Sequence, residues 1–290
     1  MKDFLIVTDN NGDFTREQAA LEGLRIQPMR LTVDGRDMLN DPDETDIRTK
    51  DFYDLMRAGS DCKTSALNME DYTEFLEPLL AEGNDLLVMT FSSGLSSSAN
   101  NCELAARELR EKYPERKLLV ADTLCASMGQ ALLVYHAWLR REKGESLETV
   151  YQWVLENRLR LCHWFTVDDL MYLKRGGRVS AATAIVGSLL SIKPVLHVDN
   201  EGHLINMYTK RGRKAAIRAL VDEYRKRSAQ SADDPVFISH GDCPEDAKYL
   251  EQQLRAEFGL TNIVTGYIGP VIGSHSGPGC LALFFLGNER

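Results

Sequence analysis

Apolar residues form two kinds of pattern along the first half of the chain. Short, continuous apolar runs fill residues 4–8, 85–91 and 117–121, which predicts buried strands. Between these runs, apolar residues recur every three or four positions, as they do at 99–109 and 125–141, which predicts helices. Strands that alternate with helices predict an α/β fold whose parallel sheet is covered on both faces.

The order of elements changes in the second half. Residues 193–209 contain two strand-like runs on either side of a turn at 199–202, which predicts an antiparallel hairpin. The same patterns predict helices at 214–227 and 245–258 and strands at 235–239, 261–267 and 281–286. We therefore expect two domains, a Rossmann-like parallel-sheet domain at 1–160 and an α+β domain with a mixed or antiparallel sheet at 161–290.

The composition narrows the class of protein. Of the 290 residues, 43% are apolar and 27% are charged, as in soluble globular proteins. The net charge of −9 argues against a nucleic-acid partner, which would need an excess of Lys and Arg. No apolar run approaches the ~18–20 residues of a membrane span, and the N-terminal apolar stretch is too short for a signal peptide. Six scattered cysteines without metal-ligand spacing favour a reducing compartment, so we expect a cytoplasmic protein.

A cluster of hydroxyl groups stands at a junction between a predicted strand and a predicted helix. Residues 92–98 contain five serines and one glycine. The first N–H groups of a helix lack partners within the helix, and this end of the helix dipole is positive. Such a junction binds anions, and serine hydroxyls add donors for a carboxylate or a phosphate. The alternative is that one serine caps the helix and the others lie in a solvated turn.

Three further segments carry polar side chains that suit an anion. Thr64 and Ser65 precede a predicted helix, where they form either its N-terminal cap or a second pair of hydroxyl donors. His275 lies in a predicted loop rich in glycine and proline at 269–279, where it either donates to an anion or is incidental to a connector. Basic stretches at 173–178 and 210–214 suit a phosphate or an acidic partner, or form a solvated face.

Two kinds of chemistry receive less support from the residues. The segment 9–13 follows a strand and is rich in Asp and Asn, but Asn11 and Ala20 stand where phosphatases and calcium loops need carboxylates, so we expect no metal. A serine-dependent acyl hydrolase or transferase could use Ser96 with His275 and Asp122. The surrounding sequence is not the Gly-x-Ser-x-Gly elbow of hydrolases, and there is no Walker loop for ATP.

Taken in order, these motifs resemble the DegV family of bacterial fatty-acid-binding proteins, over a region of about residues 3–287. The resemblance is carried by 6–9 (Ile-Val-Thr-Asp), 64–65 (Thr-Ser), 92–96 (Ser-Ser-Gly-Leu-Ser), 120–130 (Val-Ala-Asp-Thr-Leu-Cys-Ala-Ser-Met-Gly-Gln), 173–178 (Leu-Lys-Arg-Gly-Gly-Arg) and 273–279 (Gly-Ser-His-Ser-Gly-Pro-Gly). The resemblance implies two α/β domains with a long-chain fatty acid buried between them. It also implies a lipid carrier without a cofactor or an activity of its own.

The resemblance further implies roles for individual residues. Thr64 and Ser96 would bind the fatty acid carboxylate, and Ser65, Ser93 and His275 would be neighbours in the same network. Some members of the family present the fatty acid to a separate ATP-dependent fatty acid kinase, which converts the carboxylate to an acyl phosphate for phospholipid synthesis. Arg211 resembles the arginine with which the family docks on that kinase.

The chain departs from the family pattern at three places. Residues 66–68 are Ala-Leu-Asn where a small residue, Pro and Ser are usual, residues 97–98 are Ser-Ser where Gly-Thr is usual, and Asn10 stands where Ser is common. Thr64 and Ser96 are unaffected. These departures bear on the preferred acyl chain and on the geometry around the carboxylate.

Overall fold

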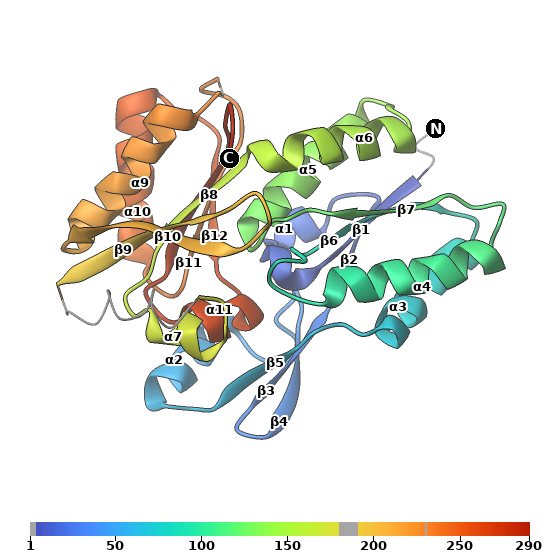
Figure 1. The fold of residues 1–290 in the computed structure, drawn as a ribbon, viewed down its shortest axis with the longest axis horizontal. Helices are drawn as coiled ribbons and strands as arrows, with labels where there is room; N and C mark the ends of the chain where they lie inside the picture. The colour runs from blue at the N-terminus through green and yellow to red at the C-terminus, as the bar shows by residue number, and fades with distance from the viewer. Residues whose placement is uncertain (1–3, 180–190, 230) are drawn as a thin grey trace.

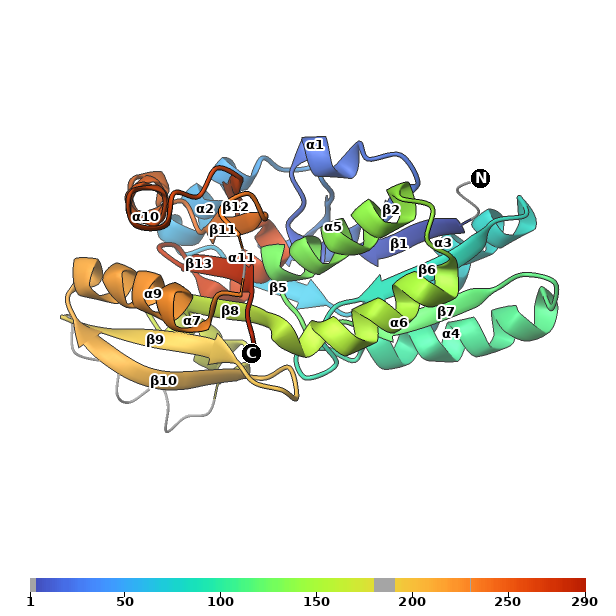
Figure 2. The same cartoon turned by 90° about the horizontal axis from the view of Figure 1, so that it is seen from above.

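The computed structural model describes residues 4–179, 191–229 and 231–290. Within these residues the strands form a four-stranded, a six-stranded and a three-stranded sheet. Figures 1 and 2 show the two larger sheets side by side, with helix α5 (Met128–Glu142) between them. None of the described helices is long and apolar enough to cross a bilayer.

The four-stranded sheet is parallel throughout and has the strand order β2-β1-β6-β7. Its strands and helices are β1 (Phe4–Asp9), β2 (Leu24–Gln27), β6 (Asp85–Thr90), β7 (Leu118–Asp122), α1 (Arg16–Ala19), α3 (Met69–Ala81), α4 (Ser98–Lys112), α5 and α6 (Leu147–Asn157), with the 3-10 turn η1 (Asn10–Gly12) after β1. Along β6, Leu86 and Val88 pack under α3 and α4, whereas Leu87 and Met89 pack under α5 and α6. The predicted parallel sheet with both faces covered is therefore confirmed.

The six-stranded sheet is mixed and has the order β10-β9-β8-β13-β11-β12. Its elements are β8 (Leu161–Thr166), β9 (Ile192–Val198), β10 (Leu204–Arg211), β11 (Val236–His240), β12 (Ile263–Tyr267), β13 (Leu281–Leu286), α7 (Met171–Arg175), α9 (Arg213–Arg227) and α10 (Pro244–Phe258), with the turn η2 (Arg158–Arg160) before β8. The hairpin β9–β10 and both long helices agree with the sequence patterns. The sequence patterns did not predict the buried strand β8. The division into two domains stays a prediction.

Helix α5 packs on both large sheets. It contacts β1 and η1 on one side and β8, β11 and β13 on the other. Seven consecutive residues, 128–134, are buried, which is the pattern of a helix surrounded by protein. The helix begins three residues later than predicted, because Ser127 has a φ of 52° and so cannot lie in a right-handed helix.

The three-stranded sheet corrects one prediction. Strands β3 (Met29–Val33), β4 (Arg36–Asn40) and β5 (Cys62–Ser65) pair antiparallel in the order β4-β3-β5, with helix α2 (Thr49–Ala58) between β4 and β5. Thr64 and Ser65 therefore lie on an edge strand and do not cap a helix. The cap of α3 is Asn68, whose side chain accepts a hydrogen bond from Asp71 N. Strand β5 has only four residues, of which none is fully buried, so it carries no apolar signal.

The segment predicted as a loop at 269–279 also differs, because it contains helix α11 (Pro270–Ser276). Proline suits the first turn of a helix, and Gly277, with a φ of 77°, suits its end. Helix α11 contacts α7, α2 and strands β3 and β5. This segment therefore contains a short helix that begins at Pro270, includes Gly273 and ends before Gly277.

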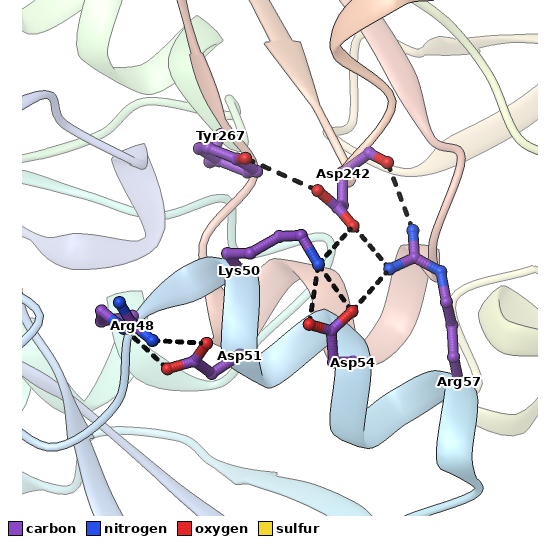
Figure 3. Close-up of polar contacts among 7 residues, drawn as sticks. All are labelled: Arg48, Lys50, Asp51, Asp54, Arg57, Asp242 and Tyr267. Atoms are coloured by element: carbon purple, nitrogen blue, oxygen red, sulfur yellow. Dashed lines mark hydrogen bonds and ion pairs between the residues drawn. The ribbon is translucent and has the colours of Figure 1, made fainter.

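Helix α2 is tied to the second half of the chain by charged side chains (Figure 3). Arg57 Nη1 lies 2.5 Å and Lys50 Nζ 3.7 Å from the carboxylate of Asp242, which follows β11. On the buried side of α2, Tyr53 Oη donates to Ile268 O at 2.9 Å. Because Ile268 lies two residues before α11, this bond and the direct contact between α2 and α11 hold the two helices together.

Candidate functional site

A cavity lies between the two large sheets and beside the three-stranded sheet. Its empty volume, counted out to the mouth, is about 900 Å³, which is within the range of small-molecule sites. Apolar side chains from both halves form most of its wall, among them Met29, Phe91, Leu95, Phe165, Val198, Leu204, Val271, Ile272, Ala282 and Phe284. Such a wall suits a hydrocarbon chain.

Four of the predicted site residues line this cavity together. They are Thr64, Ser65, Ser96 and His275, which come from β5, the junction before α4, and α11. Thr64 Oγ1 lies 2.8 Å from His275 Nε2, across 211 positions of the chain. Strand β5 and helix α11 are in contact, and this contact brings the two side chains together.

Ser96 is held by a short chain of hydrogen bonds. Its Oγ lies 2.9 Å from Ser98 Oγ and accepts from Ser98 N. Ser98 Oγ in turn accepts from Leu67 N at 3.2 Å, three residues after Thr64. The N-terminal cap residue of α4, Ser97, makes no side-chain capping bond. The serine cluster therefore connects the junction to the segment that carries Thr64. The alternative of one capping serine with the others in a solvated turn does not describe it, because Ser92 and Ser98 are fully buried.

His275 is neutral at physiological pH. Burial, with a smaller effect of the nearby Arg178 charge, lowers the pKa of the imidazole from 6.5 to about 4. A neutral imidazole can donate one hydrogen bond and accept one. Its Nδ1 is buried and has no hydrogen-bond partner among the described residues, whereas Nε2 pairs with Thr64 Oγ1. A Cβ added at Gly176 would lie 2.2 Å from Nδ1, and only glycine lets the end of α7 approach the ring so closely.

Three predicted residues lie outside the cavity. Ser93 is exposed, and its backbone N donates to Asp122 Oδ1 at 3.2 Å. Arg211 is exposed at the end of strand β10. Asp122 Oδ1 accepts from two backbone N–H groups, those of Ser93 and Leu124. Among the described residues no hydrogen bond joins Ser96 to His275 or Asp122 to His275, and the serine hydrolase alternative is not supported.

Several polar residues at the cavity were not among the individual site residues predicted from the sequence. Arg178, from the basic stretch 173–178, lines the same cavity as His275. On the inner wall, Ser127 Oγ donates to Asp13 Oδ2 at 2.5 Å, and Asp13 Oδ1 accepts from Gly269 N at 2.9 Å. Burial raises the pKa of Asp13 from 3.8 to about 7. The positions of Asp13 after β1 and Ser127 before α5 were the only signals in the sequence.

The inner wall also contains a histidine that stays uncharged. His163 Nε2 accepts from Ala126 N at 3.2 Å, and Nδ1 lies 3.1 Å from Leu161 O, to which it donates. Burial holds the pKa of this imidazole well below 6.5. No group of three or more His, Cys, Asp or Glu residues suited to a metal occurs in the described part of the chain. Arg178 therefore brings a guanidinium to a cavity whose other polar lining groups are hydroxyls, imidazoles and one amide, and whose wall is mainly apolar.

A family model described as "Uncharacterised protein, DegV family COG1307" matches residues 3–288. The chain belongs to the DegV family. The resemblance to this family seen in the sequence motifs is thereby confirmed. A DegV domain-containing protein of Clostridium perfringens is 39% identical over 290 residues, which cover 100% of this chain and 99% of that protein.

Solved structures of similar proteins share the fold. A DegV family protein from Thermus thermophilus, described by its fatty acid binding, has 28% identity and a TM-score of 0.88, with 98% of this chain and 99% of that chain covered. The Streptococcus pneumoniae Fatty Acid Kinase (Fak) B3 protein, loaded with linoleic acid, has 21% identity and a TM-score of 0.85, with 98% and 99% covered. The α/β fold with a parallel and a mixed sheet is therefore that of the family.

Proposed function

We propose that this protein binds one long-chain fatty acid in the cavity between its two large sheets. The carboxylate lies at Thr64, Ser96 and His275, with Ser65 and Arg178 beside it, and the tail lies along the apolar wall. The observation that carries this proposal is the arrangement of hydroxyls and a neutral imidazole on one cavity whose wall is mainly apolar. The fatty acid binding of the Thermus thermophilus relative supports it.

The energetics agree with such a ligand. Burying ~14 methylene groups at ~0.8 kcal/mol each gives roughly 11 kcal/mol before the costs of association. The carboxylate must end on hydrogen-bond donors, because an unpaired charge in an apolar site is strongly unfavourable. Hydroxyls and one imidazole can supply these donors at Thr64, Ser96 and His275. Such donors leave the carboxylate more reactive than a bidentate arginine pair would.

The protein then acts as a carrier that presents the fatty acid to a fatty acid kinase for acyl-phosphate formation. The kinase association of the Streptococcus pneumoniae protein, which has the same fold, suggests this step. Arg211, which is exposed on the edge strand of the mixed sheet, is the docking residue in this proposal. Arg211→Ala should lower the rate of acyl-phosphate formation with a partner kinase and leave fatty acid occupancy unchanged. Loss of occupancy, or an unchanged rate, would contradict this role.

The test of the binding site is the double variant Thr64→Ala with Ser96→Ala. Protein purified under native conditions should carry a near-stoichiometric long-chain fatty acid by mass spectrometry, and the double variant should carry much less while remaining folded. Ser97→Ala with Thr149→Ala removes two exposed hydroxyls and serves as the matched control. Wild-type occupancy in the double variant would reject this carboxylate site. An empty wild-type protein that takes up no added fatty acid would reject the carrier function.

A further inference from the structure

A buried serine holds the turn that carries Ser96. Ser92 is fully buried and is not among the residues that line the cavity. Its backbone N donates to Cys125 O at 3.1 Å, in the segment that leads into α5. Its backbone O accepts from Leu95 N at 3.1 Å and from Ser96 N at 3.2 Å. Ser92 therefore ties the backbone of Ser96 to the end of the parallel sheet.

The side chain of Ser92 reaches the second half of the chain. Its Oγ accepts from Gly94 N at 3.1 Å and donates to Gly202 O at 2.9 Å, across 110 positions. Gly202 lies in the hairpin tip, residues 199–203 between β9 and β10. A serine hydroxyl has a single proton to donate, and here the hairpin tip receives it. One buried hydroxyl thus joins the turn at 92–96 to the hairpin tip.

Two glycines allow the hairpin tip to approach this turn closely. A Cβ added at Gly94 would lie 2.6 Å from Glu201 O. A Cβ added at Gly202, which has a φ of 80°, would lie 2.1 Å from Ser92 Oγ. Real Cβ atoms do not make contacts as short as these. Any larger residue at either position would therefore push the hairpin tip away from the turn.

The hairpin tip is itself held in place by hydrogen bonds. Asp199 Oδ1 accepts from two backbone N–H groups of the tip, at 3.0 Å and 2.8 Å. Asp199 N donates to His203 O at 2.9 Å, and Asp199 O accepts from Arg290 Nη1 at 2.8 Å. On either side of the tip, Val198 and Leu204 line the cavity. The tip is thus a fixed support that belongs to the cavity wall.

We propose that Ser92 is a positioning residue for the fatty acid carboxylate, a role that rests on the carrier function proposed above. By bonding the hairpin tip, Ser92 fixes the turn so that the Ser96 hydroxyl points at the carboxylate. The strength of a hydrogen bond falls steeply with distance and angle, so a small shift of the turn weakens the bond from Ser96. Holding the hydroxyl in place before the ligand arrives also lowers the entropy cost of binding.

The test compares a fatty acid with the fatty alcohol of the same length. The full-length protein, freed of lipid, is titrated with tetradecanoic acid and with 1-tetradecanol by displacement of a fluorescent polyene fatty acid. The alcohol has the same tail and no charge, so its affinity depends mainly on the apolar wall. Ser92→Ala should weaken binding of the acid roughly tenfold, the effect of losing a well-placed hydrogen bond to a charged group, and should leave the affinity for the alcohol within about twofold.

A second variant tests the same contact from the backbone. Gly94 has no positive φ, so the turn itself tolerates alanine, whereas the added Cβ displaces the hairpin tip. Gly94→Ala should therefore lower the affinity for the acid and spare that for the alcohol. Ser97→Ala removes an exposed hydroxyl close to the same turn and should bind both compounds as the wild type does. Thermal unfolding of each variant identifies any loss of folding.

The outcomes separate this role from the carrier function. An unchanged ratio of the two affinities in both Ser92→Ala and Gly94→Ala would overturn the role, even if both compounds bound more weakly. The carrier function would still stand in that case, because the wild type binds the acid. A wild type that binds neither compound, or that binds the alcohol as tightly as the acid, would reject the proposed carboxylate site and this inference with it.

Discussion

Replacing Asp13 by Asn should remove part of the pH dependence of the free energy of unfolding. Asp13 is 6% exposed, and burial raises the pKa of its carboxyl from 3.8 to about 7. Between these two pH values the folded protein holds the proton and the unfolded chain does not. The free energy of unfolding therefore falls as the pH rises through this window, and the loss is complete above the folded pKa.

The size of the effect follows from the same values. The difference between 3.8 and about 7, at 1.36 kcal/mol for each pKa unit, corresponds to about 4 kcal/mol. Asparagine stays neutral at every pH. It can also keep both contacts, because its Oδ1 can accept from Gly269 N and its Nδ2 can donate to Ser127 Oγ. Asp13→Asn should therefore equal the wild type at about pH 4 and exceed its stability by up to about 4 kcal/mol at about pH 8.

The assay is guanidinium unfolding followed by tryptophan fluorescence at several pH values, with the fatty acid removed. Asp37→Asn, at an exposed carboxylate, is the control and should keep the pH dependence of the wild type. If Asp13→Asn is less stable than the wild type at about pH 8, or if its pH dependence matches the wild type, the carboxyl is not held in a destabilised ionised state.

Three further outcomes test the site and the fold. A carboxylate bound beside His275 should raise the pKa of the imidazole from about 4, so fatty acid binding near pH 6 should be accompanied by proton uptake. Calorimetry in buffers of different ionisation enthalpy measures this uptake, and His275→Gln should abolish it. Ser93→Ala should leave fatty acid occupancy at the wild-type value, because this side chain lies outside the cavity; a marked loss by mass spectrometry would contradict its placement. Arg57→Ala and Asp242→Asn should each lower the free energy of unfolding by about 1 kcal/mol and be non-additive, and additivity in a double-mutant cycle would mean that the pair in Figure 3 contributes no coupling.

Much of the architecture could be predicted from local sequence. The spacing of apolar residues a few positions apart predicts strand β6, helix α4 and the hairpin β9–β10, because each of these elements packs on a core. The position of the serine cluster at the end of β6 follows from the same pattern. So does the family resemblance, since its motifs are short segments in a fixed order.

The tertiary structure alone decided the details of the site. Thr64 lies on a short edge strand that pairs with β3, although helix α2 separates the two strands in the sequence. The residues of this strand are half-exposed and polar, so the sequence contains no apolar pattern that would predict it. The contact between Thr64 and His275 spans 211 positions, and that between Asp13 and Ser127 spans 114. Local propensity sets helices and strands, but contacts over such separations depend on how whole elements pack. For that reason the sequence determined the types of side chain available to this protein, and the packing of β5, α5 and α11 determined which of them meet.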